Sequence, residues 1–368
     1  MKYKTTNIFL CVLLIGVLFI SGCTDDVDKT NGIASMQQID VNLDVEDDEI
    51  ATCIYQNENN MIFSIGTRNG KTEGPLVNTD RLSLYNIDEQ KETILPIHKD
   101  ENVYRAMELD GGILYAIYKL REDNKYDWLL NYLVNNEERV IDKGICDSYD
   151  DIPAMKMIDN IPYYLYCDEH LNSNEKYELG VRRIKNNDVE TIFSETQKTA
   201  VSMSAFLSNG KEYCFLKGST LPIICIGDDS GIKYEKKMNM KMVDYGINDD
   251  FVICSLGIEE GDQEKLALLS INLKNGDVMK NDAEEQYYRI QGSGNAFLCV
   301  DWQFAPYQIN IENKGTPAVT KIDYPGDVDL PNSNVFFSPL GDQKYMKIYN
   351  RNTNDSDSQT EYYKLELA

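Results

Sequence analysis

The chain has 368 residues, of which 42% are hydrophobic, and it carries a formal net charge of −25 at pH 7. This length suits two average domains or one large all-β domain, and this share of apolar residues excludes a generally disordered chain. The acidic balance argues against nucleic acid as a partner and against a broad contact with anionic lipid, because both are bound through Lys and Arg.

The first 22 residues have the three parts of a secretory signal. Lys2 and Lys4 give a positive start, residues 8–20 form an apolar run, and the small residues Ser21 and Gly22 follow. The apolar run is shorter than the roughly 20 residues that span a bilayer as a helix. We therefore predict a signal peptide over residues 1–22.

The signal ends in the tetrapeptide Ile20-Ser-Gly-Cys23, which closely resembles the lipobox of bacterial lipoproteins. The resemblance implies cleavage before Cys23 and attachment of a diacylglycerol to its thiol, with further acylation of its amine by a fatty acid such as palmitate. Two or more acyl chains give stable membrane attachment. The protein would then be extracytoplasmic and lipid-anchored to the bacterial cell membrane. The alternative is a plain secretory signal with an incidental cysteine.

Residues 24–35 are polar, acidic and without periodicity. Such a composition is typical of a flexible linker. We expect residues 23–35 to form the lipidated cysteine and a tether, and residues 36–368 to form one folded domain.

A strand-like run then recurs along the chain, advancing by about 46 residues per copy between residues 63 and 337. Each copy holds a large apolar residue, followed in six of seven copies by a small one. An interval of this size is typical of propellers and other repeat arrays. The large residues are Phe63, Tyr115, Tyr164, Tyr213, Ile253, Leu298 and Phe337, and the residues after them are Ser64, Ala116, Leu165, Cys214, Cys254, Cys299 and Ser338.

A second strand with alternating apolar and polar residues follows each of these runs, and alternation of this kind is typical of a half-buried strand. After most second strands comes a turn rich in Asn, Asp or Gly, which tolerate the positive φ of hairpin turns. Shorter strand-like runs precede and follow each pair, giving four antiparallel strands per copy. The turns lie at residues 135–136, 186–188, 228–231, 275–277 and 313–315.

Seven four-stranded copies predict an all-β fold, a seven-bladed β-propeller. The strand and turn rhythm of residues 48–368 is similar to that of the broad propeller group of bacterial periplasmic and surface proteins. Six or eight blades, or a pair of β-sandwiches, are the alternatives. Two stretches compete for the strand that closes the ring, residues 36–45 and residues 362–367.

The nine cysteines form an odd set with no closely spaced pair, which is a poor framework for disulfides or a zinc site. Three of them, Cys214, Cys254 and Cys299, follow the large apolar residue of their repeat. Ser or Ala occupies this position in other copies, so we expect these cysteines to pack between blades as small hydrophobic residues. No metal and no cofactor is predicted.

Catalytic motifs are not evident. The chain has two histidines, His98 and His170, and a Ser-His-Asp site would need one of them. Acidic pairs such as Asp150-Asp151 and Asp249-Asp250 could supply the two carboxylates of a glycosidase, although such pairs arise by chance in a chain this acidic. We therefore predict no catalytic residue, and an envelope hydrolase or lyase using acidic residues on the propeller face is the alternative.

Five aromatic residues lie in or beside loops that join the second and third strands of two predicted blades, and such loops share one face of a propeller. Trp and Tyr are enriched where proteins bind partners. One hypothesis is that this face binds a ligand, and the alternative is that the aromatics pack between blades. The five residues are Tyr126, Trp128, Trp302, Phe304 and Tyr307.

These patterns together predict a membrane-anchored extracytoplasmic lipoprotein whose propeller is a non-catalytic protein- or glycan-binding module. Its expected partners are the membrane, through the N-terminal lipid, and an unidentified protein or glycan, with no nucleic acid. A structural part of a membrane complex is a further hypothesis.

Overall fold

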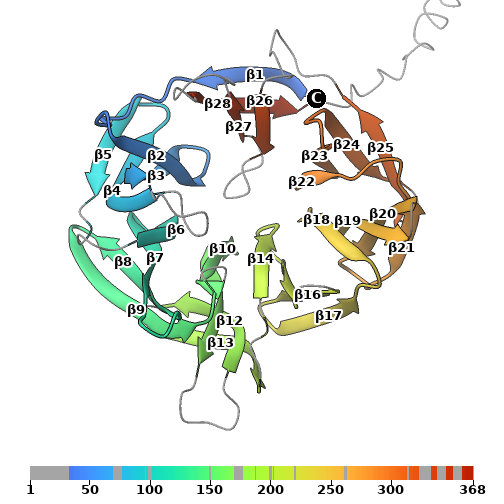
Figure 1. Ribbon diagram of the computed structural model, residues 1–368, viewed down its shortest axis with the longest axis horizontal. Coiled ribbons are helices and arrows are strands. Elements are labelled where there is room, and N and C mark those ends of the chain that lie inside the picture. Colours follow the sequence, from blue (N-terminus) through green and yellow to red (C-terminus); the bar gives the residue numbers. More distant parts are fainter. Residues whose placement is uncertain are drawn as a thin grey trace, which may run out of the picture.

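The structure, a computed structural model, describes residues 33–68, 77–95, 97, 102–148, 151–169, 177–186, 188–198, 201, 203–218, 221–260, 263–312, 315–322, 333–337, 345–350 and 359–367. Within these residues, 28 strands form seven four-stranded antiparallel sheets. The sheets stand as blades around a ring (Figure 1). The predicted seven-bladed propeller is confirmed, and the alternatives of six blades, eight blades or two sandwiches are wrong.

The first six blades take their strands in chain order from the centre of the ring to its rim. Blade 1 contains β2 (Glu49–Gln56), β3 (Asn60–Arg68), β4 (Val77–Asn86) and β5 (Lys91–Leu95), and blade 2 contains β6 (Asn102–Leu109), β7 (Gly112–Leu120), β8 (Tyr126–Val134) and β9 (Glu137–Cys146). Blade 3 contains β10 (Ala154–Ile158), β11 (Ile161–Glu169), β12 (Tyr177–Lys185) and β13 (Asp188–Gln197).

The second half of the ring follows the same plan. Blade 4 contains β14 (Met203–Ser208), β15 (Tyr213–Lys217), β16 (Ile223–Asp228) and β17 (Gly231–Lys237), and blade 5 contains β18 (Lys241–Ile247), β19 (Phe251–Glu260), β20 (Gln263–Asn272) and β21 (Val278–Asp282). Blade 6 contains β22 (Tyr288–Ser293), β23 (Ala296–Val300), β24 (Pro306–Ile311) and β25 (Pro317–Lys321). Blade 7 contains β26 (Ser333–Phe337), β27 (Tyr345–Asn350), β28 (Gln359–Leu367) and β1 (Ile33–Ile39).

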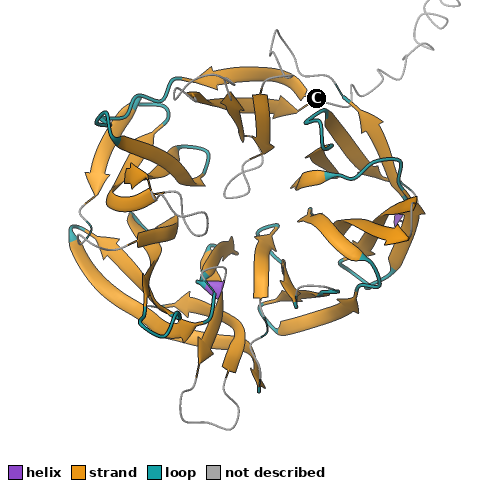
Figure 2. Cartoon of the chain, in the orientation of Figure 1, coloured by secondary structure: helices purple, strands orange, loops and turns teal. Residues whose placement is uncertain are grey.

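Hairpin turns join these strands where the sequence predicted them. The β8–β9 turn is formed by Asn135 and Asn136, with φ of 52° and 63°, as a two-residue hairpin of the primed type requires. Between β20 and β21, Gly276 has a φ of 73°, and the Asn272 side chain accepts a hydrogen bond from the Lys274 N–H at 2.9 Å. Figure 2 shows that strands and the loops between them make up nearly all of the ring.

The core is a series of apolar layers between neighbouring blades. Phe63, Tyr115 and Tyr213 are at most 1% exposed, and the small residues that follow them are buried as well. Tyr164 and Tyr166 of blade 3 pack in one cluster with Trp128 of blade 2, and comparable clusters join blades 3 and 4, 4 and 5, 5 and 6, and 1 and 2. Blades 2 to 5 are thus each stabilised by their neighbours on both sides.

The cysteines of the described chain are free thiols, and six of them are buried. Cys214, Cys254 and Cys299 are fully buried between blades, as predicted. Burial raises the pKa of each of these thiols. A thiol that stays protonated is a poor nucleophile and a poor metal ligand, so these cysteines serve in packing.

The ring closes through a strand from each end of the described chain. β28 pairs with β27, and β1 then pairs antiparallel with β28 along the rim of blade 7. Both stretches that competed for this place in the sequence are therefore used, one after the other. β1 begins at Ile33, so residues 33–35 belong to the propeller, and their assignment to the tether was wrong.

Blade 7 also corrects the alignment of the last repeat. β26, which holds Phe337, is the innermost strand of its blade, whereas Phe63 and its counterparts lie in second strands. The alignment was shifted by one strand, because blade 7 takes only three strands from the C-terminal part of the chain. Ser338, the predicted signal peptide (residues 1–22) and Cys23 lie outside the described residues.

No helix in the described part of the chain has the length and apolar character needed to cross a membrane.

Candidate functional site

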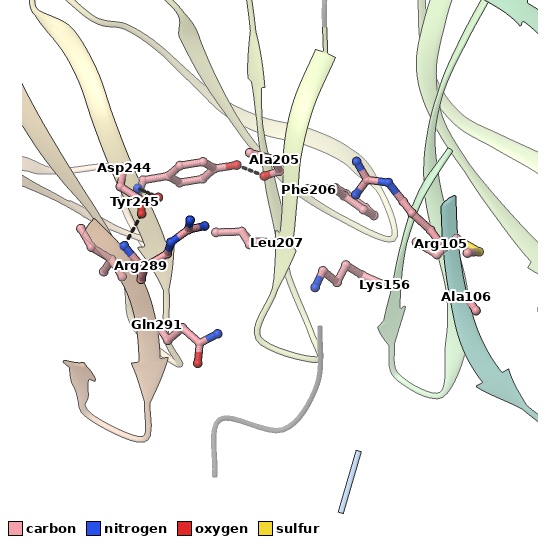
Figure 3. Close-up of a pocket in the computed structure, with 12 residues that line it drawn as sticks. Arg105, Ala106, Lys156, Ala205, Phe206, Leu207, Asp244, Tyr245, Arg289 and Gln291 are labelled. Atoms are coloured by element: carbon pink, nitrogen blue, oxygen red, sulfur yellow. Dashed lines mark hydrogen bonds between the residues drawn. The ribbon is translucent and has the colours of Figure 1, made fainter. Parts of the chain in front are cut away.

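The innermost strands of five successive blades surround a cavity of about 200 Å³ near the centre of the ring. The strands are β6, β10, β14, β18 and β22, which belong to blades 2 to 6. Figure 3 shows side chains from all five strands directed towards this space. Because every blade contributes its first strand to the axis of the ring, residues that are about 45 positions apart in sequence meet here.

Irregular pairing shapes the inner strands at the level of the cavity. The register of β6 on β7 shifts between Val103 and Arg105, and that of β18 on β19 shifts between Met242 and Asp244. β14 and β22 have similar shifts, at which Ala205 and Arg289 adopt positive φ of 56° and 54°. A β-bulge re-aims the side chains beside it and is frequent next to functional sites. The cavity is lined by residues at these bulges.

Hydrogen bonds tie three of the inner strands together beside the cavity. The carboxylate of Asp244 accepts hydrogen bonds from the backbone N–H of Arg289 on β22 and, at 2.8 Å, from the N–H of Tyr245. The Tyr245 hydroxyl donates to the carbonyl oxygen of Ala205 on β14. Figure 3 shows these links between blades 4, 5 and 6. Asp244 and Tyr245 are thus engaged in holding the wall of the cavity.

Basic side chains dominate the polar lining. Arg105, Lys156 and Arg289 come from three different blades, and Asp244 is the one acidic residue among those that line the cavity in the described chain. The guanidinium of Arg105 lies 4.8 Å from the ring centre of Tyr104, a cation–π contact that helps to orient it. With three basic groups and one acidic group, the described lining carries a formal charge of +2, in a chain whose net charge is −25.

The pKa values of two lining residues reflect this setting. Burial, together with the nearby positive charge of Arg105, lowers the pKa of the Lys156 ammonium to about 8. Burial raises the pKa of the Asp244 carboxyl, while the backbone N–H groups that it accepts from and the Arg289 charge oppose this shift. Lys156 is therefore mainly protonated at neutral pH and faces a like charge.

A second hollow, of about 420 Å³, lies between hairpins of blades 2 and 3. Its lining includes Asp110, Asn160 and Asn186, which have φ between 45° and 61°. Hairpin turns need such residues for conformational reasons, so their presence requires no ligand. A charged residue in the middle of an apolar inner strand has no comparable local explanation, and this favours the central cavity as the functional site.

Two of the five predicted aromatic site residues belong to blade 2. Trp128 is 0% exposed, and its indole Nε1 donates to the carbonyl oxygen of Cys167 in blade 3 at 2.9 Å. Tyr126 is partly buried, with its ring edge-on to that of Tyr118 at 5.7 Å. Trp128 packs between blades, as the alternative interpretation held, and is not accessible as a surface site.

The other three aromatic residues lie at the β23–β24 loop of blade 6. Trp302 is 64% exposed, while Phe304 and Tyr307 are partly buried. Asp301 orders this loop, since its Oδ1 accepts the N–H groups of Gln303 at 2.8 Å and Ala305 at 2.9 Å. Blades 2 and 6 are separated by blades 7 and 1 on one side and by three blades on the other (Figure 1). The five aromatics therefore do not form one patch.

The described part of the chain contains neither a cluster of metal-binding residues nor a histidine. No group of three or more His, Cys, Asp or Glu residues in the described ranges is arranged to hold a metal ion. His98 and His170 both lie outside those ranges.

No family model matches the chain, and no curated protein matches it. Among solved structures, a chain of the mitotic checkpoint complex has a TM-score of 0.50 at 11% identity, over 92% of this chain and 95% of that chain. The polysaccharide lyase Uly1 has a TM-score of 0.48 at 10% identity, over 92% and 94%. The tricorn protease has a TM-score of 0.40 at 12% identity, over 76% of this chain but only 36% of that chain. At such identities, a likeness shows the fold alone.

Sequence reasoning missed the central cavity, although a signal for it exists. Arg105 and Lys156 each stand near the middle of a short strand that precedes the large apolar residue of its repeat, and Arg289 is the second residue of such a strand. Asp244 stands in the middle of the first strand of blade 5, at a different register. A charged residue in each of several inner strands predicts convergence at the axis, once the propeller is recognised.

Proposed function

We propose that the protein is a lipoprotein held on the outer side of the bacterial cell membrane, whose propeller binds a protein or glycan without transforming it. The observation that carries the binding role is the central cavity, into which polar side chains from several blades converge. Concave sites with a few convergent polar groups on a rigid frame are typical of ligand binding. The lipobox resemblance at Cys23 supports the membrane location.

Cys23 is expected to carry the lipid. Cells that express the full-length protein and are fed an alkyne analogue of palmitate should incorporate the label into the wild type and into Cys11→Ser, and not into Cys23→Ser. Cys11 lies within the predicted signal peptide, so it is a matched control. An unlabelled wild-type protein released into the medium would support the plain secretory signal instead.

The binding role is tested by a thermal-shift screen of envelope glycans and peptides. A ligand that binds the folded state raises the melting temperature by mass action. We expect at least one such ligand to be recovered chemically unchanged, and Leu207→Trp, which fills the cavity, to abolish its effect. Leu221→Trp is the control, because Leu221 is 47% exposed and lies outside the lining.

Two outcomes would contradict this proposal. Conversion of the ligand to a product, detected by mass spectrometry, would favour the envelope hydrolase or lyase. A shift that Leu207→Trp leaves unchanged would place the binding site elsewhere. No specific observation favours the enzyme at present, because Asp244, the carboxylate of the described lining, already accepts two backbone hydrogen bonds.

A further inference from the structure

The geometry of the central cavity points to the chemical class of its ligand. We propose that the cavity binds an anionic group, a phosphate or a carboxylate, held between Arg105, Lys156 and Arg289. This inference rests on the proposed binding role. Each of these residues comes from a different inner strand: Arg105 from β6, Lys156 from β10 and Arg289 from β22. In Figure 3, Lys156 and Arg289 extend from facing walls towards the space between the strands.

The charge of the cavity is opposite to that of the molecule. The described residues of the lining have a formal charge of +2, whereas the chain as a whole carries −25. Carboxylates far outnumber basic groups in this chain and could neutralise cations at many places, as Asp142 does for the partly buried Arg182 at 2.7 Å. Among the described residues that line the cavity the balance is reversed, and a cleft with low-dielectric walls focuses such a field on an entering ion.

The acidic residue of the lining does not remove this positive field. Asp244 accepts hydrogen bonds from the backbone N–H groups of Tyr245 and Arg289 and interacts with the Arg289 charge, so it offsets one of the three basic charges of the described lining. Lys156 has a lowered pKa because it is buried near the positive charge of Arg105. Arg105 and Lys156 thus bring two like charges near each other across neighbouring blades, which favours an anion between them.

The volume of the cavity limits the size of the anion. About 200 Å³ lies below the ~300–1,000 Å³ of pockets that enclose drug-sized molecules. A small phosphate, or one acidic sugar residue, fits this class. Phe206 and Leu207 of β14 add apolar lining beside the charged groups. The same chemistry serves a free inorganic anion and an acidic sugar, and these are distinguished by the probes below.

The test is a calorimetric titration of the full-length protein in detergent, at pH 7 and constant ionic strength. The probes are pyrophosphate and glucuronate, with glucose as the neutral comparator. We expect at least one anion to bind, glucose not to bind, and the affinity to fall tenfold or more in Lys156→Gln and in Arg105→Gln. A tenfold loss corresponds to about 1.4 kcal/mol of binding free energy, which the loss of one hydrogen bond to a charged group can account for.

Lys274→Gln is the matched control, since it removes the same charge from a side chain that is 79% exposed and pairs with Asp250. It is expected to bind like the wild type. Arg289→Gln provides a second test should Lys156→Gln not fold. Preference for pyrophosphate would identify a phosphate site, and preference for glucuronate would identify an acidic sugar site.

The inference is overturned if neither anion binds, or if Lys274→Gln weakens binding as much as Lys156→Gln. Binding of a neutral glycan or peptide that Leu207→Trp abolishes, without binding of either anion, would leave the proposed function standing and show this inference to be wrong.

Discussion

Removal of residues 1–39 is expected to destabilise the propeller far more than removal of residues 1–32. The longer deletion takes away β1, which is the outermost strand of blade 7 and the only strand of that blade from the N-terminal end of the described chain. β1 pairs with β28 at six positions, from Ile33 opposite Leu367 to Ile39 opposite Tyr362. Its loss leaves one edge of β28 unpaired.

The size of this destabilisation follows from the number of backbone hydrogen bonds between β1 and β28. At a net ~1 kcal/mol for each hydrogen bond, the loss of pairing along β1 predicts a destabilisation on the order of 4–6 kcal/mol. Ile39 also packs on the cluster of Phe63 and Tyr362 that joins blade 7 to blade 1, so the deletion weakens this interface as well. Urea denaturation, followed by tyrosine fluorescence or circular dichroism, measures the difference.

A synthetic peptide of residues 33–45 provides the control. It should restore the stability of the protein that starts at residue 40, and the same peptide with Gln38→Pro should restore it less, because proline removes a backbone donor and fits poorly in a paired strand. Equal stability of the proteins that start at residues 33 and 40 would show that β1 is not a closing strand.

The blade count was predictable from the sequence because it depends on local patterns. Alternating strands and turns such as Asn135-Asn136 recur with each blade, and local sterics suffice to form them. The last repeat was misaligned because the fourth strand of its blade lies at the other end of the chain. The sequence around Phe337 does not indicate that this strand is supplied from there.

The central cavity was harder to predict because it depends on the closed ring. Lys156 in Ala154–Ile158 looks like a single charged residue in an apolar strand, and only the ring places it near Arg105 and Arg289. Trp128 illustrates the opposite error. It is two residues from the start of β8, and its position near a loop suggested exposure, whereas the adjoining blade covers it completely.

Trp128→Ala is expected to destabilise the protein by ~3–5 kcal/mol, the usual cost of truncating a buried Trp or Phe. The indole is 0% exposed, and it fills the layer between blades 2 and 3. Gly144, its cross-strand neighbour on β9, leaves room for the ring, since a Cβ there would approach the indole Cζ2 to 2.5 Å. Gly144 therefore has no side chain with which to fill the space that the indole leaves.

Two further variants separate packing from hydrogen bonding and from surface effects. Trp128→Phe keeps a ring and loses the hydrogen bond to the Cys167 carbonyl, so about 1 kcal/mol of destabilisation is expected beyond the small change in packing. Trp302→Ala should change stability by less than ~0.5 kcal/mol, because Trp302 is 64% exposed. Urea denaturation of the three variants gives these values.

If Trp302→Ala proved as costly as Trp128→Ala, the assignment of Trp128 to the interior and of Trp302 to the surface would fail. With the expected values, Trp302 is the aromatic residue whose replacement tests ligand binding on a fully folded protein.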